Sequence, residues 1–145
     1  MARAEASLVI NRPIDKVFAY MADILKGTEW QSELLEVHQT SSGPLGIGTT
    51  LKEIRRLLGR NMETAFTITE YEPDIKLGFT STSGPIQMHA YYDLDGSGDG
   101  TKVTMTVEAE LTGVFKMTEP LVVHTANRQM AIDIAKLKNI LESVA

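Results

Sequence analysis

The sequence predicts an α+β domain in which a curved antiparallel sheet of about seven strands wraps around one long C-terminal helix, with two short helices after the first strand. Residues 49–111 contain five strand-like runs separated by turn residues at short intervals, which is typical of consecutive hairpins. Residues 102–111 alternate between apolar and polar side chains, so one face of the sheet should be buried and the other wet. The segment after Thr118 carries a single apolar stripe with helical spacing.

The length and composition fit one soluble globular domain, which we expect to span residues 1–145. The chain has 145 residues, of which 43% are hydrophobic and 23% charged, and a domain of this size buries roughly 70% of its unfolded surface. The net charge of -5 disfavours nucleic acid as a partner, because binding to phosphates needs clustered Lys and Arg.

The expected location is the cytoplasm. No apolar run approaches the ~20 residues that cross a bilayer, and the N-terminus lacks the pattern of a signal peptide. The absence of cysteine fits a reducing compartment. We therefore expect no membrane span, and a monomer or a homodimer.

The first elements are expected to be a strand, two short helices and a second strand. Residues 3–10 alternate weakly and end in an apolar triplet, which predicts a strand, and Pro13 suits the first turn of a helix. The buried face of that helix has the spacing i, i+3, i+4, i+7, with Ile14, Val17, Phe18 and Met21. A further helical turn or two is expected near 28–31, before a strand at 34–39.

Five strands are expected after the loop-forming segment 41–48. They are predicted at 49–58, 62–71, 75–83, 86–94 and 102–111. In the last of them the buried face is expected to carry Val103, Met105, Val107, Ala109 and Leu111.

Residues 93–101, with the sequence DLDGSGDGT, have the alternating acidic residues of a calcium loop. A complete loop of that kind needs a Glu at its twelfth position, but counting from Asp93 this place is Thr104, and counting from Asp95 it is Thr106. The segment also joins two predicted strands, where glycine and aspartate favour a tight turn. We therefore favour a hairpin turn; a weak surface ion site is the alternative.

The chain is expected to end in a long helix with Thr118 as its N-cap and Glu119-Pro120 in its first turn. Its apolar stripe consists of Val123, Asn127, Met130, Ile134, Leu137, Leu141 and Val144. At ~1.5 Å per residue such a helix is roughly 38 Å long, enough to cross the sheet. Because only 6% of residues are aromatic, we expect the space between helix and sheet to be incompletely filled.

Four stretches in this order carry a resemblance to a known superfamily. They are INRPIDKVFAYMAD at 10–23 followed by Trp30, Gly48-Thr49 at the start of a strand, ITEYEPDIKLGF at 68–79, and LKNILE at 137–142. Together they resemble the START-like, or helix-grip, superfamily (SRPBCC), which includes polyketide cyclases, the birch pollen allergen and lipid-transfer domains. The sequence is most similar to its polyketide cyclase/dehydrase-like branch.

The resemblance implies a helix-grip fold that binds a small hydrophobic ligand between the sheet and the C-terminal helix, such as a lipid, a polyketide-like molecule or another apolar metabolite. One alternative is a polyketide cyclase/aromatase-like enzyme acting in the same cavity, and a second is a protein-interaction module with a collapsed cavity. By strand phase, the expected lining is Trp30, Phe66, Ile68, Phe79, Met88, Tyr92, Met105, Val107, Val123, Asn127 and Met130. A bulge would exchange Met88 and Tyr92 with His89 and Tyr91.

The polar residues that could act on a ligand are Arg55, Tyr92, His124 and Asn127. Asn127 interrupts the apolar stripe, and a buried amide must be hydrogen-bonded, so it would bind either a ligand or nearby backbone and water. For His124 we favour a solvated helix surface over an acid or base. Tyr92 is either a residue of the cavity or a core tyrosine with its hydroxyl bonded.

Glu53 and Arg55 share the phase of Leu51 and Leu57. If those leucines face inward, an ion pair would lie in the cavity as an anchor for a ligand hydroxyl or carboxylate. We favour the other phase, in which Ile54 faces inward and the charges lie in water.

No metal or other cofactor is expected. None of the three histidines, His38, His89 and His124, has another histidine three or four positions away, so a zinc site is not indicated. The segment 46–48 lacks the third glycine and the following helix of a dinucleotide-binding loop.

Overall fold

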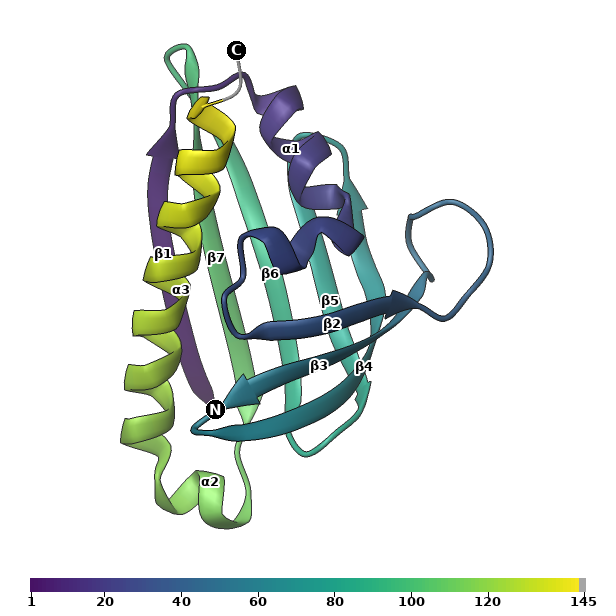
Figure 1. The fold of residues 1–145 in the computed structure, drawn as a ribbon, viewed down its shortest axis with the longest axis vertical. Coiled ribbons are helices and arrows are strands. Elements are labelled where there is room, and N and C mark those ends of the chain that lie inside the picture. The colour runs from purple at the N-terminus through teal and green to yellow at the C-terminus, as the bar shows by residue number, and fades with distance from the viewer. Residues whose placement is uncertain (144–145) are drawn as a thin grey trace.

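A seven-stranded antiparallel sheet bends around a long C-terminal helix in the computed structural model, which describes residues 1–143 (Figure 1). The strands are β1 (Ala2–Ile10), β2 (Leu34–Gln39), β3 (Thr50–Leu57), β4 (Arg60–Glu72), β5 (Lys76–Ser83), β6 (Gln87–Ser97) and β7 (Gly100–Glu110). Their order across the sheet is β1-β7-β6-β5-β4-β3-β2, and every neighbouring pair is antiparallel. The predicted helix-grip fold is confirmed.

Within residues 1–143, four helical segments accompany the sheet: α1 (Ile14–Ala22), the 3-10 helix η1 (Ile24–Glu29), α2 (Gly113–Met117) and α3 (Glu119–Ser143). The short helix α2 was not predicted. It changes the role of Thr118, whose hydroxyl donates to the carbonyl oxygen of Val114 (2.7 Å) instead of capping α3. Val144, the last residue of the predicted stripe, lies outside the described residues. Within the described part of the chain, no helix is long and apolar enough to cross a membrane.

The free edge of the sheet at β1 is covered by α3, which runs alongside it (Figure 1). The side-chain oxygen of Asn127 accepts a hydrogen bond from the backbone N–H of Glu5 (2.9 Å). Further along, the ammonium group of Lys138 donates to the carbonyl oxygen of Val9 (2.7 Å). Two side chains of α3 thus bind backbone groups that an edge strand otherwise leaves unpaired.

A bulge in β4 decides which of its residues face the interior. The register passes from Ile68 opposite Phe79 to Glu70 opposite Gly78, so Thr69 is the additional residue. The bulge turns Tyr71 inward, where its ring packs edge-on against Phe18 of α1 at 5.6 Å. Glu70 consequently lies on the outer face.

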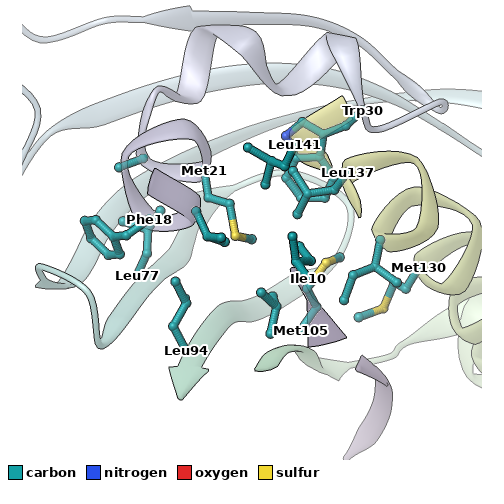
Figure 2. Close-up of a cluster of buried hydrophobic side chains, with 14 of the residues drawn as sticks. Ile10, Phe18, Met21, Trp30, Leu77, Leu94, Met105, Met130, Leu137 and Leu141 are labelled. Atoms are coloured by element: carbon teal, nitrogen blue, oxygen red, sulfur yellow. The ribbon is translucent and has the colours of Figure 1, made fainter. Parts of the chain in front are cut away.

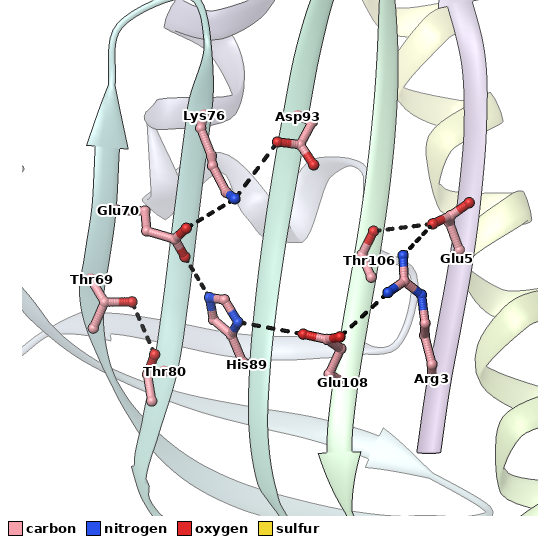
Figure 3. A network of polar contacts seen from close by, with 10 residues as sticks. All are labelled: Arg3, Glu5, Thr69, Glu70, Lys76, Thr80, His89, Asp93, Thr106 and Glu108. Carbon is pink, nitrogen blue, oxygen red and sulfur yellow. Dashed lines mark hydrogen bonds and ion pairs between the residues drawn. The ribbon is translucent and has the colours of Figure 1, made fainter. Parts of the chain in front are cut away.

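The outer face of the sheet carries a chain of charged groups (Figure 3). Glu70 binds His89 and forms an ion pair with Lys76 (3.0 Å), while Glu108 lies between His89 (3.8 Å) and Arg3 (3.4 Å). Burial alone would raise the pKa of Glu70, but hydrogen bonds from His89 and Lys76 outweigh it and lower the pKa. These groups lie on the side of the sheet away from α3 (Figure 3).

The segment 93–101 is a hairpin, as expected. β6 continues to Ser97 and β7 begins at Gly100, and Gly98 supplies the positive φ of 60° that the turn requires. Among residues 1–143, no group of three or more His, Cys, Asp or Glu is placed to hold a metal ion.

The buried side chains of the described residues form two clusters. The larger one joins α1, α3 and the sheet and includes Ile10, Phe18, Trp30, Leu77, Leu94, Met105, Leu137 and Leu141 (Figure 2). The smaller one lies near α2 and consists of Ala2, Met62, Ile86, Leu111 and Val122. The core is therefore divided rather than continuous.

Replacing Asn127 with Ala should loosen β1 locally, because the Glu5 N–H loses its acceptor. We expect the Glu5 amide to exchange with solvent about tenfold faster, which corresponds to about 1.4 kcal/mol of lost protection. NMR-detected hydrogen exchange measures this rate, with the exposed neighbour Arg128→Ala as the matched control. An unchanged Glu5 rate in Asn127→Ala would show that this contact does not hold the edge.

Candidate ligand-binding cavity

A cavity of about 410 Å³ lies between α3 and the concave face of the sheet. Its lining includes Trp30 and Met105 from the larger core cluster and Met62 and Val122 from the smaller one. Cavities of roughly 300–1,000 Å³ are typical of small-molecule sites. The protein's own side chains do not fill the interior, so the alternative with a collapsed cavity does not describe this structure.

Most residues expected in the lining are there. The cavity wall includes Trp30, Phe66, Phe79, Met88, Tyr92, Met105, Val107, Val123 and Met130. The pairings of β6 with β5 and β7 show no register shift, so Met88, Ala90 and Tyr92 all face the cavity. His89 lies on the outer face instead.

Three predicted residues lie elsewhere. Ile68 is fully buried in the larger core cluster and does not border the cavity. Asn127 is turned toward β1, where it binds the backbone of Glu5, so the interpretation with a backbone partner describes it. His124 is exposed on α3 and outside the lining, as expected for a solvated helix surface.

Glu53 and Arg55 point into the cavity, and the favoured prediction that they face water was wrong. Leu51 is buried, and the pairing of β3 with β4 has no register shift, so alternate residues of β3 stay on the inner face. The Nε of Arg55 donates to Oε1 of Glu53 (3.1 Å), and its Nη2 donates to Oε1 of Gln31 (2.5 Å). An ion pair with an amide partner is therefore part of the cavity wall.

The Arg55–Glu53 pair is largely removed from solvent. Its side chains keep 30% and 17% of their surfaces accessible, respectively. Burial alone would lower the pKa of Arg55, but the charge and hydrogen bond of Glu53 outweigh burial and raise the pKa. The guanidinium thus stays charged, and Glu53 balances that charge locally.

Tyr92 presents its hydroxyl to the same polar group. Its ring is held by edge-on contacts with Trp30 (6.0 Å) and Phe79 (5.9 Å). Burial raises the pKa of Tyr92; the charges of Glu53 and Asp133 add to this effect, and the charge of Arg55 and a hydrogen bond with the side chain of Gln31 oppose it. The phenol therefore remains protonated at neutral pH and can donate a hydrogen bond.

Asp133 is a buried acid of the cavity wall that was not predicted from the sequence. Its Oδ1 accepts hydrogen bonds from the backbone N–H of Ser32 (3.1 Å) and from Nε2 of Gln129 (2.9 Å). Burial raises its pKa, although these hydrogen bonds and the charge of Arg55 oppose the change. Asp133 stands three positions after Met130 and four before Leu137, so the helical spacing could have found it.

The cavity therefore combines mostly apolar walls with a set of neighbouring polar side chains. We call this set the polar cluster; it consists of Gln31, Glu53, Arg55, Tyr92 and Asp133. Such a wall can hydrogen-bond one polar atom of a guest while the rest of the guest packs against apolar side chains. The same residues could polarise a carbonyl or hold a proton close to one.

Replacing Asp133 with Asn should stabilise the protein at neutral pH. Burial raises the pKa of Asp133 above about 4, the ordinary value for aspartate, so the folded state favours the protonated carboxyl. As the pH rises from about 4 through the raised pKa, this carboxyl has to ionise in the interior, and the folded protein loses stability. Asn removes the charge but keeps an oxygen for Ser32 and Gln129. We expect a higher free energy of unfolding at pH 7 and a smaller change at pH 4, measured by urea denaturation. Equal losses of stability at both pH values would contradict this account.

Comparisons with known proteins agree with this architecture. The family described as "Polyketide cyclase / dehydrase and lipid transport" matches residues 1–142. No significant sequence match is found among curated proteins.

Several solved structures share the fold. A protein of Thermus thermophilus superposes with a TM-score of 0.86 at 17% identity, covering 99% of both chains. The ZhuI aromatase/cyclase of a Streptomyces species gives 0.80 at 13% identity, covering 97% of this chain and 93% of its own. A START superfamily protein of Mycobacterium smegmatis gives 0.79 at 12% identity, covering 100% of both chains. At these identities the structures show a shared fold, and the family match identifies the chain as a member of the polyketide cyclase/dehydrase and lipid transport family.

Proposed function

We propose that the protein binds a small, largely apolar organic molecule in the cavity under α3. The observation that carries this proposal is an interior space of about 410 Å³ with mostly apolar walls and one polar cluster. Burial of apolar surface contributes about 2.5 kcal/mol per 100 Å², so a guest of this size would gain enough to offset the cost of its immobilisation. The family description, which names lipid transport and cyclisation, supports a ligand of this kind.

The turn between β3 and β4 lies at the rim of the proposed site. Leu58 and Gly59 border the cavity and are exposed, and both have positive φ values, 51° and 77°. Positive φ is strained for leucine, and Leu58 places an apolar side chain, 41% exposed, beside the opening. This turn is the proposed point of entry for the ligand.

A second candidate function is a cyclase-like enzyme acting in the same cavity. The paired Arg55 and Glu53 and the protonated Tyr92 favour it, because they could stabilise an enolate and transfer a proton within an apolar enclosure. Product formation from a linear poly-β-carbonyl chain would support catalysis. Binding of that chain without turnover would support the binding function alone.

Enlarging a side chain of the cavity wall should block binding without unfolding the protein. Ala126 of α3 borders the cavity, so Ala126→Phe would place its ring in space that the guest uses. We expect the affinity for the neutral fluorescent probe N-phenyl-1-naphthylamine to fall at least about tenfold, equivalent to 1.4 kcal/mol. Fluorescence titration measures this affinity.

The matched control is Ala131→Phe, at an exposed position on the same helix, which should bind the probe like the wild type. In a filled interior, Ala126→Phe would instead cost about 1–3 kcal/mol of stability through overpacking. Failure of the wild-type protein to bind the probe, or to retain any apolar molecule in native mass spectrometry after purification, would contradict the proposed function.

A further inference from the structure

We propose that the ligand carries a neutral hydrogen-bonding group, a hydroxyl or carbonyl rather than a carboxylate, and that this group binds at Arg55 and Tyr92. The inference rests on the proposed function and specifies its ligand class. It predicts neutral alcohols, phenols or ketones with an apolar body, and it assigns the selection against acids to Glu53 and Asp133.

The balance of charge in the polar cluster favours a neutral ligand group. The one guanidinium, on Arg55, already pairs with Glu53 at 3.1 Å, and Asp133 places a second carboxyl group on the same wall. A ligand carboxylate would lose its hydration and meet a cation that is already neutralised, next to two acidic side chains. Such a site repels an anion while accepting an uncharged group of the same shape.

The other charged residues of the wall do not change this balance. They are Arg3, Glu33 and Arg56; the two arginines are exposed, and Glu33 is half-buried. The guanidinium of Arg3 is engaged by Glu5 (3.0 Å) and Glu108 (3.4 Å). The exposed arginines are screened by solvent, and Glu33 adds a further negative charge that also disfavours an acid. The attraction of a ligand anion therefore depends on the polar cluster, whose guanidinium is already paired.

The hydrogen-bonding groups of the polar cluster also suit a hydroxyl or a carbonyl. The bonds of Arg55 to Glu53 and Gln31 use Nε and Nη2, which leaves the N–H groups of Nη1 for a guest. The Tyr92 hydroxyl has a hydrogen bond with the side chain of Gln31, and it keeps its proton because burial raises its pKa. A ligand carbonyl can accept from both residues, and a ligand hydroxyl can also donate to Glu53.

Apolar surface extends along the cavity beyond the polar cluster. Asp133 and Val122 both border the cavity, and their separation along α3 corresponds to roughly 16 Å. At the Val122 end the wall is formed with Ile86 and Leu111. A guest bound at Arg55 therefore has apolar wall along which its body can extend.

The test compares matched neutral and acidic probes at pH 7.5: 2-naphthol with 2-naphthoate, and 1-decanol with decanoate. Affinities are measured by displacement of N-phenyl-1-naphthylamine. We expect the neutral member of each pair to bind at least tenfold more tightly to the wild type. An apolar cavity alone also favours neutral molecules over acids. The diagnostic quantity is therefore the ratio of the affinity for the neutral probe to the affinity for its acid, and how this ratio changes when an acidic side chain of the polar cluster is neutralised.

Glu53→Gln leaves the charge of Arg55 unpaired and should reduce the ratio at least fivefold by strengthening binding of the acid. Asp133→Asn keeps its hydrogen bonds while removing a charge, and should shift the ratio in the same direction by a smaller factor. If Glu53→Gln does not fold, the ratio measured in Asp133→Asn still tests the inference. Glu110→Gln, at an exposed position of β7 outside the cavity lining, is the matched control and should leave the ratio unchanged.

Tighter binding of the acids by the wild type would overturn the inference and leave the proposed function standing. If the ratio of neutral to acid affinity does not change in Glu53→Gln and Asp133→Asn, the inference is likewise overturned and the proposed function stands. Absence of binding by every probe, including N-phenyl-1-naphthylamine, would overturn the proposed function itself and the inference with it.

Discussion

The position of α3 is the constraint on which the rest of the structure depends, because one helix serves two surfaces of the sheet. It pairs with the free edge of β1 through Asn127 and Lys138, and it also covers the concave face. Because these hydrogen bonds hold α3 beside β1, the helix cannot move closer to the concave face of the sheet. Side chains fill the end near α1 and the end near α2, and the space between them remains as the cavity.

Much of the fold could be predicted because periodicity reports directly on burial. The alternation in residues 102–111 and the stripe on the C-terminal helix each have a single dominant period, so the sheet, its buried face and the long helix follow from them. The helix α2 escaped prediction because five residues are too few to show a period. The bulge at Thr69 escaped because it depends on a register shift against β5, and no local pattern in β4 encodes that shift.

The candidate site was less predictable because strand phase and partner choice are tertiary properties. Hydropathy favours placing Glu53 and Arg55 in water, but unbroken pairing with β4 keeps them on the same face as buried Leu51. Charged groups kept in an apolar wall reduce stability unless they are paired, and such departures from local rules are common at functional sites. Asn127 shows the opposite case, since a polar residue that suggested a ligand contact binds the backbone of β1 instead.

The most direct test of this account is a high-resolution crystal structure of the wild-type protein grown with 2-naphthol. The account predicts density for the guest between α3 and the sheet, with its oxygen within hydrogen-bonding distance of the Arg55 guanidinium and its rings against the apolar wall. A structure in which Met62, Met88 and Met130 fold inward and occupy this space, with no room for a guest, would contradict it.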